Sequence, residues 1–261
     1  MKKFVKLFAL ALAICTLLCC VGCVSDESTV KTYEDIKAAG KIVIATSPDF
    51  PPFESIEGGE VVGIEIDILN HIAKKWGITL DIQQVNFDAV LPGVQAGKYD
   101  VGVSGITIDE DRKKNADFTD PYFLAAQSIV VKVDSPIASK ADLAGKNISV
   151  QTGTTAEKYC LSNNYNVSAF EANNDAFSAL TSGKVDAWVV DNEVAVKMIE
   201  GDATVKMLDE AMTTEPYGFA FQKGSTDLAK HFSDEINAMI DDGTMKAIFD
   251  KYDVPYVSPK Q

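Results

Sequence analysis

Arg112 is the only arginine in a chain that holds 24 lysine and arginine residues in total. Its guanidinium offers a planar fork of N–H donors that matches a carboxylate two bonds at a time, which a lysine ammonium cannot do. A single arginine at the end of the segment 104–112 therefore suggests a specific anion site. The alternative is an arginine on a helix surface that pairs with Asp109 or Asp111.

Hydroxyl side chains and one acid follow other predicted strands and could complete such a site. Thr107 and Thr154 each stand three residues before a glutamate, the spacing of a capping box. This spacing predicts that both open helices, where free N–H groups and the helix dipole favour an anion. The Ser104 hydroxyl and the Thr155 amide would be further donors. Asp191 ends an apolar run, where its carboxylate would be costly unless a ligand ammonium paired with it. A carboxylate site that faces an ammonium site describes an α-amino acid.

An internal repeat indicates how these residues could meet. The segment 88–103 runs from Asp-Ala through a predicted helix to Gly-Lys-x-Asp and a buried strand, and the segment 175–190 repeats this order. Gly40-Lys41 and Gly145-Lys146 likewise precede predicted strands. The chain thus contains two α/β units of similar plan, and in such units ligands bind beyond the carboxyl ends of the strands. The predicted strand ends are 47–53, 104–112, 152–155 and Asp191.

Two further apolar runs, 128–133 and 216–221, stand after the first and after the second copy of the repeat. Two such crossings are expected when a second lobe is inserted within the first. The predicted architecture is α/β with two lobes joined by two hinge strands. The predicted bounds are 33–126 and 220–261 for lobe 1 and 127–219 for lobe 2.

The loop 47–53 carries three prolines and two phenylalanines. Because proline cannot donate to a strand ladder, we expect irregular backbone here. A rigid loop with aromatic side chains at a strand end is a candidate wall for a ligand.

The charge and the N-terminus limit the class of protein. A formal net charge of −14 argues against a nucleic-acid or anionic-membrane surface. Residues 1–22 join three lysines to an apolar run too short to span a bilayer, which predicts a signal peptide. Gly22-Cys23 resembles a lipobox, although Cys20 stands at −3 where leucine is usual. Alternatives are lipidation at Cys19 or Cys20, or simple cleavage and secretion. Lipidation at Cys23 would leave 23–32 as a tether and Cys160 as the single thiol, packed as a small hydrophobe.

The whole chain resembles the extracellular solute-binding proteins of polar amino-acid ABC importers, family 3. Any one of its motifs is weak, but the ordered set is specific. The motifs are Gly22-Cys23, Phe50-Pro51-Pro52-Phe53-Glu54, Gly63-Ile64-Glu65-Ile66-Asp67, Phe87-Asp88, Gly97-Lys98-Tyr99-Asp100, Ser104-Gly105-Ile106-Thr107-Ile108, Arg112-Lys113-Lys114, Asp117 to Tyr122, Gln151-x-Gly153-Thr154-Thr155, Asp191, Glu215-Pro216-Tyr217-Gly218 and Asp242-Gly243-Thr244.

This resemblance implies roles for residues of the predicted site. Arg112 would bind the ligand α-carboxylate, helped by the Thr107 hydroxyl and the amides of Thr107 and Thr155. The Gly105 carbonyl, the Thr107 hydroxyl and Asp191 would hold the α-ammonium. The aromatic residues that would flank the ligand side chain are Phe50 and Phe87.

Departures from the family pattern bear on the ligand side chain. Ser47 stands where binders of basic amino acids often carry aspartate, and Ala156 stands where a long polar side chain often follows the Gly-Thr-Thr motif. Both favour a neutral polar amino acid such as glutamine. Asp49 and Glu54 keep arginine as the second candidate.

The resemblance also implies a type II periplasmic-binding-protein fold in which ligand shifts an open–closed equilibrium toward closure. The expected protein is a monomer that is anchored by lipid to the extracytoplasmic face of the cell membrane. It would deliver its amino acid to an ABC permease, without metal, cofactor or catalysis. The alternatives are a sensory ligand-binding lipoprotein and a periplasmic dehydratase on the same fold.

Overall fold

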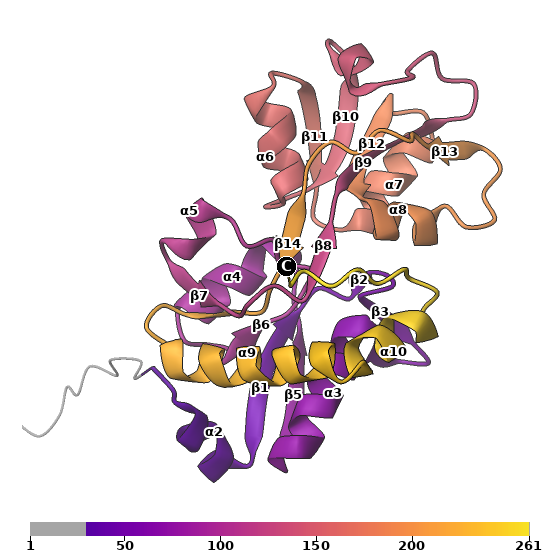
Figure 1. Ribbon diagram of the computed structural model, residues 1–261. Helices are drawn as coiled ribbons and strands as arrows, with labels where there is room; N and C mark the ends of the chain where they lie inside the picture. Colours follow the sequence, from indigo (N-terminus) through magenta and orange to yellow (C-terminus); the bar gives the residue numbers. More distant parts are fainter. Residues whose placement is uncertain (1–29, 261) are drawn as a thin grey trace, which may run out of the picture.

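The computed structural model describes residues 30–260. The predicted signal peptide 1–22, the predicted lipid-attachment residue Cys23 and most of the tether 23–32 lie outside the described residues. Within residues 30–260, no helix combines the length and the apolar character needed to cross a membrane. The chain forms two lobes, each built on one five-stranded sheet with helices packed against it (Figure 1).

The first lobe holds the sheet β5-β1-β6-β15-β7. Strand β1 is parallel to β5 and β6, whereas β15 runs antiparallel between β6 and β7. Its strands are β1 (Lys41–Thr46), β5 (Thr79–Gln84), β6 (Val101–Gly102), β7 (Ala116–Phe118) and β15 (Ala220–Gln222). Its helices are α2 (Tyr33–Ala39), α3 (Ile64–Trp76), α4 (Phe87–Gln95), α5 (Glu110–Lys113), α9 (Thr226–Asp241) and α10 (Thr244–Lys251).

The second lobe holds the sheet β11-β10-β12-β9-β13. Strand β10 is parallel to β11 and β12, and β9 is antiparallel to β12 and β13. Its strands are β9 (Gln127–Lys132), β10 (Asn147–Gln151), β11 (Asn166–Phe170), β12 (Ala187–Asp191) and β13 (Val205–Met207). Its helices are the 3-10 turn η1 (Lys140–Leu143), α6 (Thr155–Ser162), α7 (Asn173–Thr181) and α8 (Asn192–Met198).

The two sheets confirm the internal repeat. In each lobe the central strand follows a Gly-Lys pair: β1 starts at the lysine of Gly40-Lys41, and β10 starts directly after Gly145-Lys146. Each of these two strands pairs in parallel on both sides. The orders β5-β1-β6 and β11-β10-β12 are therefore equivalent, and each is closed by an antiparallel strand. Because parallel strands end at one edge of a sheet, the loops that carry the candidate residues gather there.

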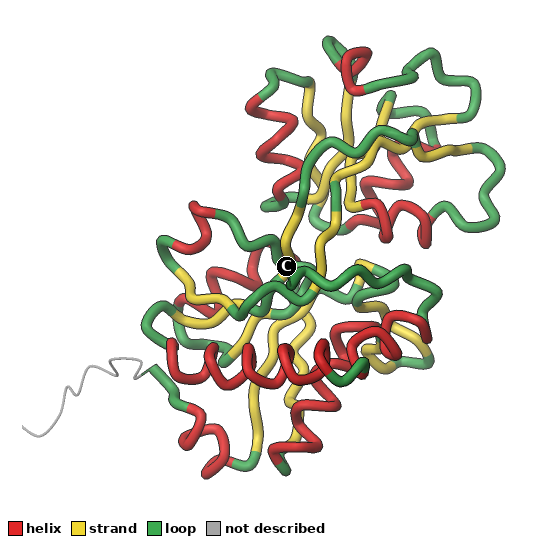
Figure 2. Tube along the Cα trace, in the orientation of Figure 1, coloured by secondary structure: helices red, strands yellow, loops and turns green. Residues whose placement is uncertain are grey.

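The chain passes between the two sheets at β8 (Phe123–Ala125) and β14 (Glu215–Tyr217), which pair antiparallel (Figures 1 and 2). The apolar run 128–133 lies almost wholly in β9 of the second sheet, so it does not form the crossing that the sequence predicts. A buried sheet strand and a crossing strand have the same apolar pattern, and only the pairing separates them.

A buried aromatic cluster anchors the two crossing strands in the first lobe. The Tyr217 ring lies 5.2 Å from that of Phe53, and Phe53 lies 5.5 Å from Phe123. Tyr122 packs beside Tyr217 with ring centroids 6.3 Å apart. Rings of this size bury a large apolar area and hold preferred tilted arrangements. The base of each crossing strand is therefore fixed by packing.

The proline-rich loop contains more regular structure than its sequence predicts. Strand β2 (Asp49–Phe50) pairs with the start of β3 (Glu54–Glu57), which continues to β4 (Glu60–Val62). The expectation of no ladder was wrong because the two paired residues fit between Pro48 and Pro51, so no proline nitrogen has to donate.

Candidate ligand-binding site

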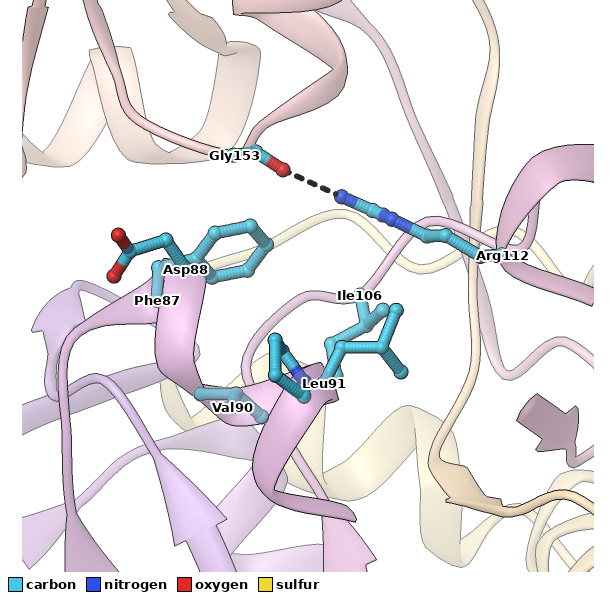
Figure 3. A pocket seen from close by; sticks show the side chains of 8 residues that line it. Phe87, Asp88, Val90, Leu91, Ile106, Arg112 and Gly153 are labelled. Atoms are coloured by element: carbon cyan, nitrogen blue, oxygen red, sulfur yellow. Dashed lines mark hydrogen bonds between the residues drawn. The ribbon is translucent and has the colours of Figure 1, made fainter. Parts of the chain in front are cut away.

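Arg112 reaches from the first lobe to the second. Its Nη1 donates to the Thr107 carbonyl at 2.9 Å, and its Nη2 donates to the Gly153 carbonyl at 3.1 Å. The guanidinium carbon lies 5.7 Å from the centre of the Phe87 ring, an arrangement suited to a cation–π contact. Figure 3 shows the guanidinium above this ring and aimed at Gly153. Arg112 is thus held in the cleft between the lobes rather than paired on a helix surface.

Two cavities flank this guanidinium. One of about 130 Å³ is lined by Phe87, Ile106, Arg112 and Gly153, with the start of helix α4 as its floor (Figure 3). The other, of about 420 Å³, opens between α5 and the first turn of α6. Arg112 and Gly153 line both cavities, so the arginine stands between two open spaces at the lobe boundary.

The helix that carries Arg112 begins later than the capping box predicts. Helix α5 starts at Glu110, and its N-cap is Asp109, whose carboxylate accepts the Arg112 amide at 2.7 Å. Thr107 instead forms a β-bridge with Tyr217. The prediction that Thr107 caps a helix was wrong because aspartate two residues later is an equally strong cap and competes for the same donors. Asn86 is the N-cap of α4, whose first residue is Phe87.

Thr154 caps helix α6 as predicted. Its hydroxyl accepts the Glu157 amide at 3.1 Å and donates to the Gln151 carbonyl at 2.7 Å. The first-turn amide of Thr155 has no partner within its own helix and therefore stays available at the cleft edge. The Thr154 hydroxyl is occupied by the cap, which leaves the backbone amides as the donors of this turn.

Ser104 and Gly105 rest on two buried acids. The Ser104 hydroxyl donates to Glu54 at 2.7 Å, and the Gly105 amide donates to the Glu65 carboxylate at 3.0 and 3.2 Å. The Tyr122 hydroxyl also donates to Glu65. The Ser104 side chain therefore points into the first lobe, and the Gly105 backbone is fixed through its amide.

Burial controls the ionisation of this acid pair. It raises the pKa of Glu54 well above its usual value, and the neighbouring Glu65 raises it further. Burial also raises the pKa of Glu65, against hydrogen bonds from Tyr122 and Gly105 that lower it. Both carboxyl groups are fully buried. The sequence suggested that Glu54 could contact a ligand side chain, but its burial prevents this. The role of Glu54 is to support the Ser104-Gly105 turn.

Asp191 ends strand β12 and is 8% exposed. The Gln127 amide donates to its Oδ1 at 2.6 Å. Burial raises the pKa of Asp191 well above its usual value, and the nearby Glu215 carboxylate raises it further, whereas Arg112 acts in the opposite direction. Within residues 30–260 no lysine or arginine forms an ion pair with it. The site thus offers an acid that a cation would stabilise in its charged form.

Three predicted site residues belong to the first lobe: Ser47, Phe50 and Phe87. The Ser47 hydroxyl donates to Asp49 at 2.9 Å. Phe50 is buried 6.4 Å from the Tyr217 ring and packs on Gly105. Phe87 remains partly exposed beneath Arg112. Phe50 therefore shapes the floor under the loop, and Phe87 forms an open wall.

Contacts between the lobes join Asp49 to residues that are not candidate site residues. Asp49 accepts the Asn173 amide at 2.7 Å and the Gln151 side-chain amide at 3.2 Å. Asn86 donates to Glu171 at 3.0 Å across the same edge. The two lobes therefore touch in this structure. Asn86, Glu171 and Asn173 lie outside the strand ends that the sequence predicts, so no local signal marked them.

The fold and this cleft define a two-lobe binding protein. Residues 42–254 match the family model for bacterial extracellular solute-binding proteins, family 3. The chain belongs to that family.

Individual relatives agree with this assignment. The chain is similar to the ABC transporter glutamine-binding protein GlnH of Bacillus subtilis, with 34% identity over 97% of each chain. It is also similar to the arginine-bound structure of a truncated ArgBP from T. maritima, with a TM-score of 0.76 and 36% identity over 79% of this chain and 99% of that one. A third similar structure is an ancestral amino acid-binding protein described as a precursor of cyclohexadienyl dehydratase. Its TM-score is 0.79, with 34% identity over 84% of this chain and 98% of that one.

Proposed function

We propose that this protein binds a free L-amino acid in the cleft between its lobes and delivers it to an ABC permease. The observation that supports the proposal is that Arg112, in α5 of the first lobe, acts electrostatically on Asp191, at the end of β12 in the second. A guanidinium fork suits the α-carboxylate, and a buried acid suits the α-ammonium. The amides of Thr107 and Thr155 would complete the carboxylate site, and the Gly105 carbonyl and Thr107 hydroxyl would complete the ammonium site. Relatives that bind glutamine and arginine support this reading.

The ligand we propose first is a neutral polar amino acid such as glutamine. Asp49 and Glu54 were the two acids that could favour arginine, but hydrogen bonds from Asn173 and Ser104 already occupy them. Arginine remains the second candidate because the structural neighbour from T. maritima binds it. The ligand side chain would lie against Phe87, on the cavity side of Arg112.

Closure would be a hinge motion about β8 and β14, the two strands that pass between the sheets. We propose lobe bounds near 33–126 and 220–261 for the first lobe and 127–219 for the second. A ligand that touches both lobes would stabilise the closed form, which a permease could recognise. We further propose that the protein acts as a monomer held at the extracytoplasmic face by lipid on Cys23.

A thermal-shift screen of the purified protein against the twenty amino acids tests the ligand. Ligand that binds only the folded state raises the unfolding midpoint, and the increase grows with concentration above Kd. We expect glutamine, or failing that arginine, to give the largest increase, and calorimetry to give one site per chain. No shift with any amino acid would contradict the proposal. Release of the protein from membranes by Cys23→Ala tests the anchor separately.

Turnover is the second candidate, because the cleft contains an acid with a raised pKa and one similar structure is a dehydratase precursor. We favour binding because neither histidine reaches the cleft: His231 stacks on Tyr33 at 4.1 Å on the outer side of the first lobe, and His71 lies in α3. Incubation with candidate carboxylic acids, followed by product analysis, separates the two. A sensory role would instead appear as capture of a receptor rather than a permease.

A further inference from the structure

Glu215 is buried in the hinge strand β14 without a side-chain partner. The residue is 4% exposed, and no hydrogen bond or ion pair joins its carboxylate to any residue within 30–260. The Oε2 atoms of Glu54 and Glu193 are inaccessible to solvent and have no hydrogen-bond partner. The Glu215 oxygens are not among such atoms, so they retain some solvent-accessible surface. A buried carboxylate is costly unless it is paired, so this side chain requires an explanation.

The alternation of β14 places this carboxylate on the face of the strand that touches the Gly105 turn. Successive side chains of a strand point to opposite faces, so Glu215 shares its face with Tyr217. Tyr217 packs beneath Phe50 and against the Gly105 turn. On the other face, Pro216 pairs with Leu124, which is 42% exposed. Glu215 therefore lies on the same side as the predicted ligand site.

The Glu215 carboxylate acts electrostatically on both charged groups of the predicted site. Burial raises the pKa of Asp191 and Glu215 raises it further. Burial lowers the pKa of Arg112, whereas Asp109 and then Glu215 and Asp191 favour its charged form. Yet the Arg112 guanidinium donates to the carbonyls of Thr107 and Gly153, not to either acid. Two buried carboxylates thus share one cation that neither of them binds directly. A second cation between them would relieve their repulsion.

We propose that Glu215 is a second carboxylate for the ligand ammonium, acting together with Asp191. An ammonium has three N–H donors, so it can satisfy Glu215, Asp191 and the Gly105 carbonyl at once. This inference rests on the proposed function, since it takes the ligand to be an α-amino acid. It adds a selectivity: the cleft rejects carboxylic acids that lack the α-amino group, because they leave two buried acids without a cation between them.

The test compares Glu215→Gln with wild type on ligands that differ only in the amino group. The probes are L-glutamine with glutaramic acid, and L-arginine with 5-guanidinopentanoic acid. Calorimetry is used where binding is tight, and thermal shift at millimolar ligand where it is weak. Loss of a charged hydrogen bond predicts about tenfold to hundredfold weaker binding of the amino acid. Binding of the deamino acid should be unchanged or stronger, because one repulsive charge has been removed.

Two variants calibrate this result. Asp191→Asn should show the same pattern. Glu210→Gln, which removes a charge paired with Lys140 in the second lobe but keeps an acceptor for the Lys140 amide, should leave every affinity unchanged. Equal losses for the amino acid and its deamino analogue would overturn the proposal and make Glu215 a counterion of Arg112. Unchanged amino-acid binding in Glu215→Gln would also overturn it. If wild type binds neither amino acid, the proposed function fails instead.

Discussion

The Asp49 carboxylate accepts a 2.7 Å hydrogen bond from the backbone amide of Asn173, which joins strand β2 of the first lobe to the first residue of helix α7 in the second. The same carboxylate accepts from Gln151, whose amide is oriented by a 2.8 Å bond from the Asn173 side chain. Gln151 and Asn173 are both buried. This network can exist only when the lobes are closed, so it contributes to closure without touching a ligand.

Asp49→Ala should therefore weaken ligand binding by favouring the open form. Loss of charge-assisted hydrogen bonds of this kind predicts about tenfold or more in Kd, equally for every amino acid that binds. Calorimetry gives the affinities, and small-angle scattering gives the dimensions with and without ligand. Asp81→Ala, which removes contacts with Lys41 and Gln83 within the first lobe, is the control. A change in ligand preference instead would mean that Asp49 contacts the ligand side chain.

Arg112→Lys should lose most of the ligand affinity while the protein stays folded. Lysine keeps the charge, but it cannot donate to the Thr107 and Gly153 carbonyls and to a carboxylate in one plane. We expect roughly a hundredfold weaker binding by calorimetry and an unfolding midpoint close to wild type without ligand. Lys113→Ala, one residue away and paired with exposed Glu110, should bind normally. Near-wild-type affinity in Arg112→Lys would remove Arg112 from the carboxylate site.

Gly105→Ala should damage both the turn and the site. Gly105 has φ of 54°, and an added Cβ would lie 2.5 Å from Cε1 of Phe50. The backbone conformation alone costs about 1–2 kcal/mol for a residue other than glycine. Gly145→Ala is the matched control, because Gly145 has φ of 74° with nothing within 4 Å. Denaturant unfolding should show a larger loss for Gly105→Ala, together with weaker ligand binding. Equal losses would show that the Phe50 contact is unimportant.

Glu193→Gln should alter the pH dependence of stability. Burial raises the pKa of Glu193 from 4.5 to about 7, and its Oε2 is sealed without a partner. Since the folded-state pKa is above the unfolded value, this residue lowers the free energy of unfolding as pH rises from about 4.5 to about 7. The variant has no carboxyl group to ionise at this position and therefore does not lose this stability. Its free energy of unfolding, relative to that of wild type, should increase between pH 5 and pH 8.

Urea unfolding at both pH values measures the effect, which we expect to be on the order of 2–3 kcal/mol. Glu200→Gln is the control, because Lys197 lowers the pKa of that exposed carboxylate instead. A constant difference between Glu193→Gln and wild type across this range would mean that Glu193 ionises normally in the folded protein.

Cys160 should resist thiol reagents in the native protein. The residue is a free cysteine with no exposed surface, and burial raises the pKa of its thiol to about 12. Because the thiolate is the reactive form, labelling by a disulfide reagent at pH 8 should be negligible until urea unfolds the chain. Rapid labelling of the native protein would contradict the packing of α6 against the second sheet.

Much of this fold follows from local patterns in the chain. The Gly-Lys turns, the apolar runs and the repeated spacing predict two α/β units, since each depends on residues close in sequence. The single arginine and the acid at the end of an apolar run likewise indicate a site for a zwitterion. The cap of α6 at Thr154 was predictable because a capping box spans only four residues.

Other features were decided only by contacts between distant residues. Competition between two possible caps made Asp109 rather than Thr107 the N-cap of α5, and strand pairing moved the first crossing from 128–133 to β8. Asp49 looked like a ligand acid until Asn173, 124 positions later, occupied it. The sequence by itself determined which charged groups the protein has. Tertiary structure decided which of them are already paired, because hydrogen bonds and burial depend on neighbours that the local pattern does not contain.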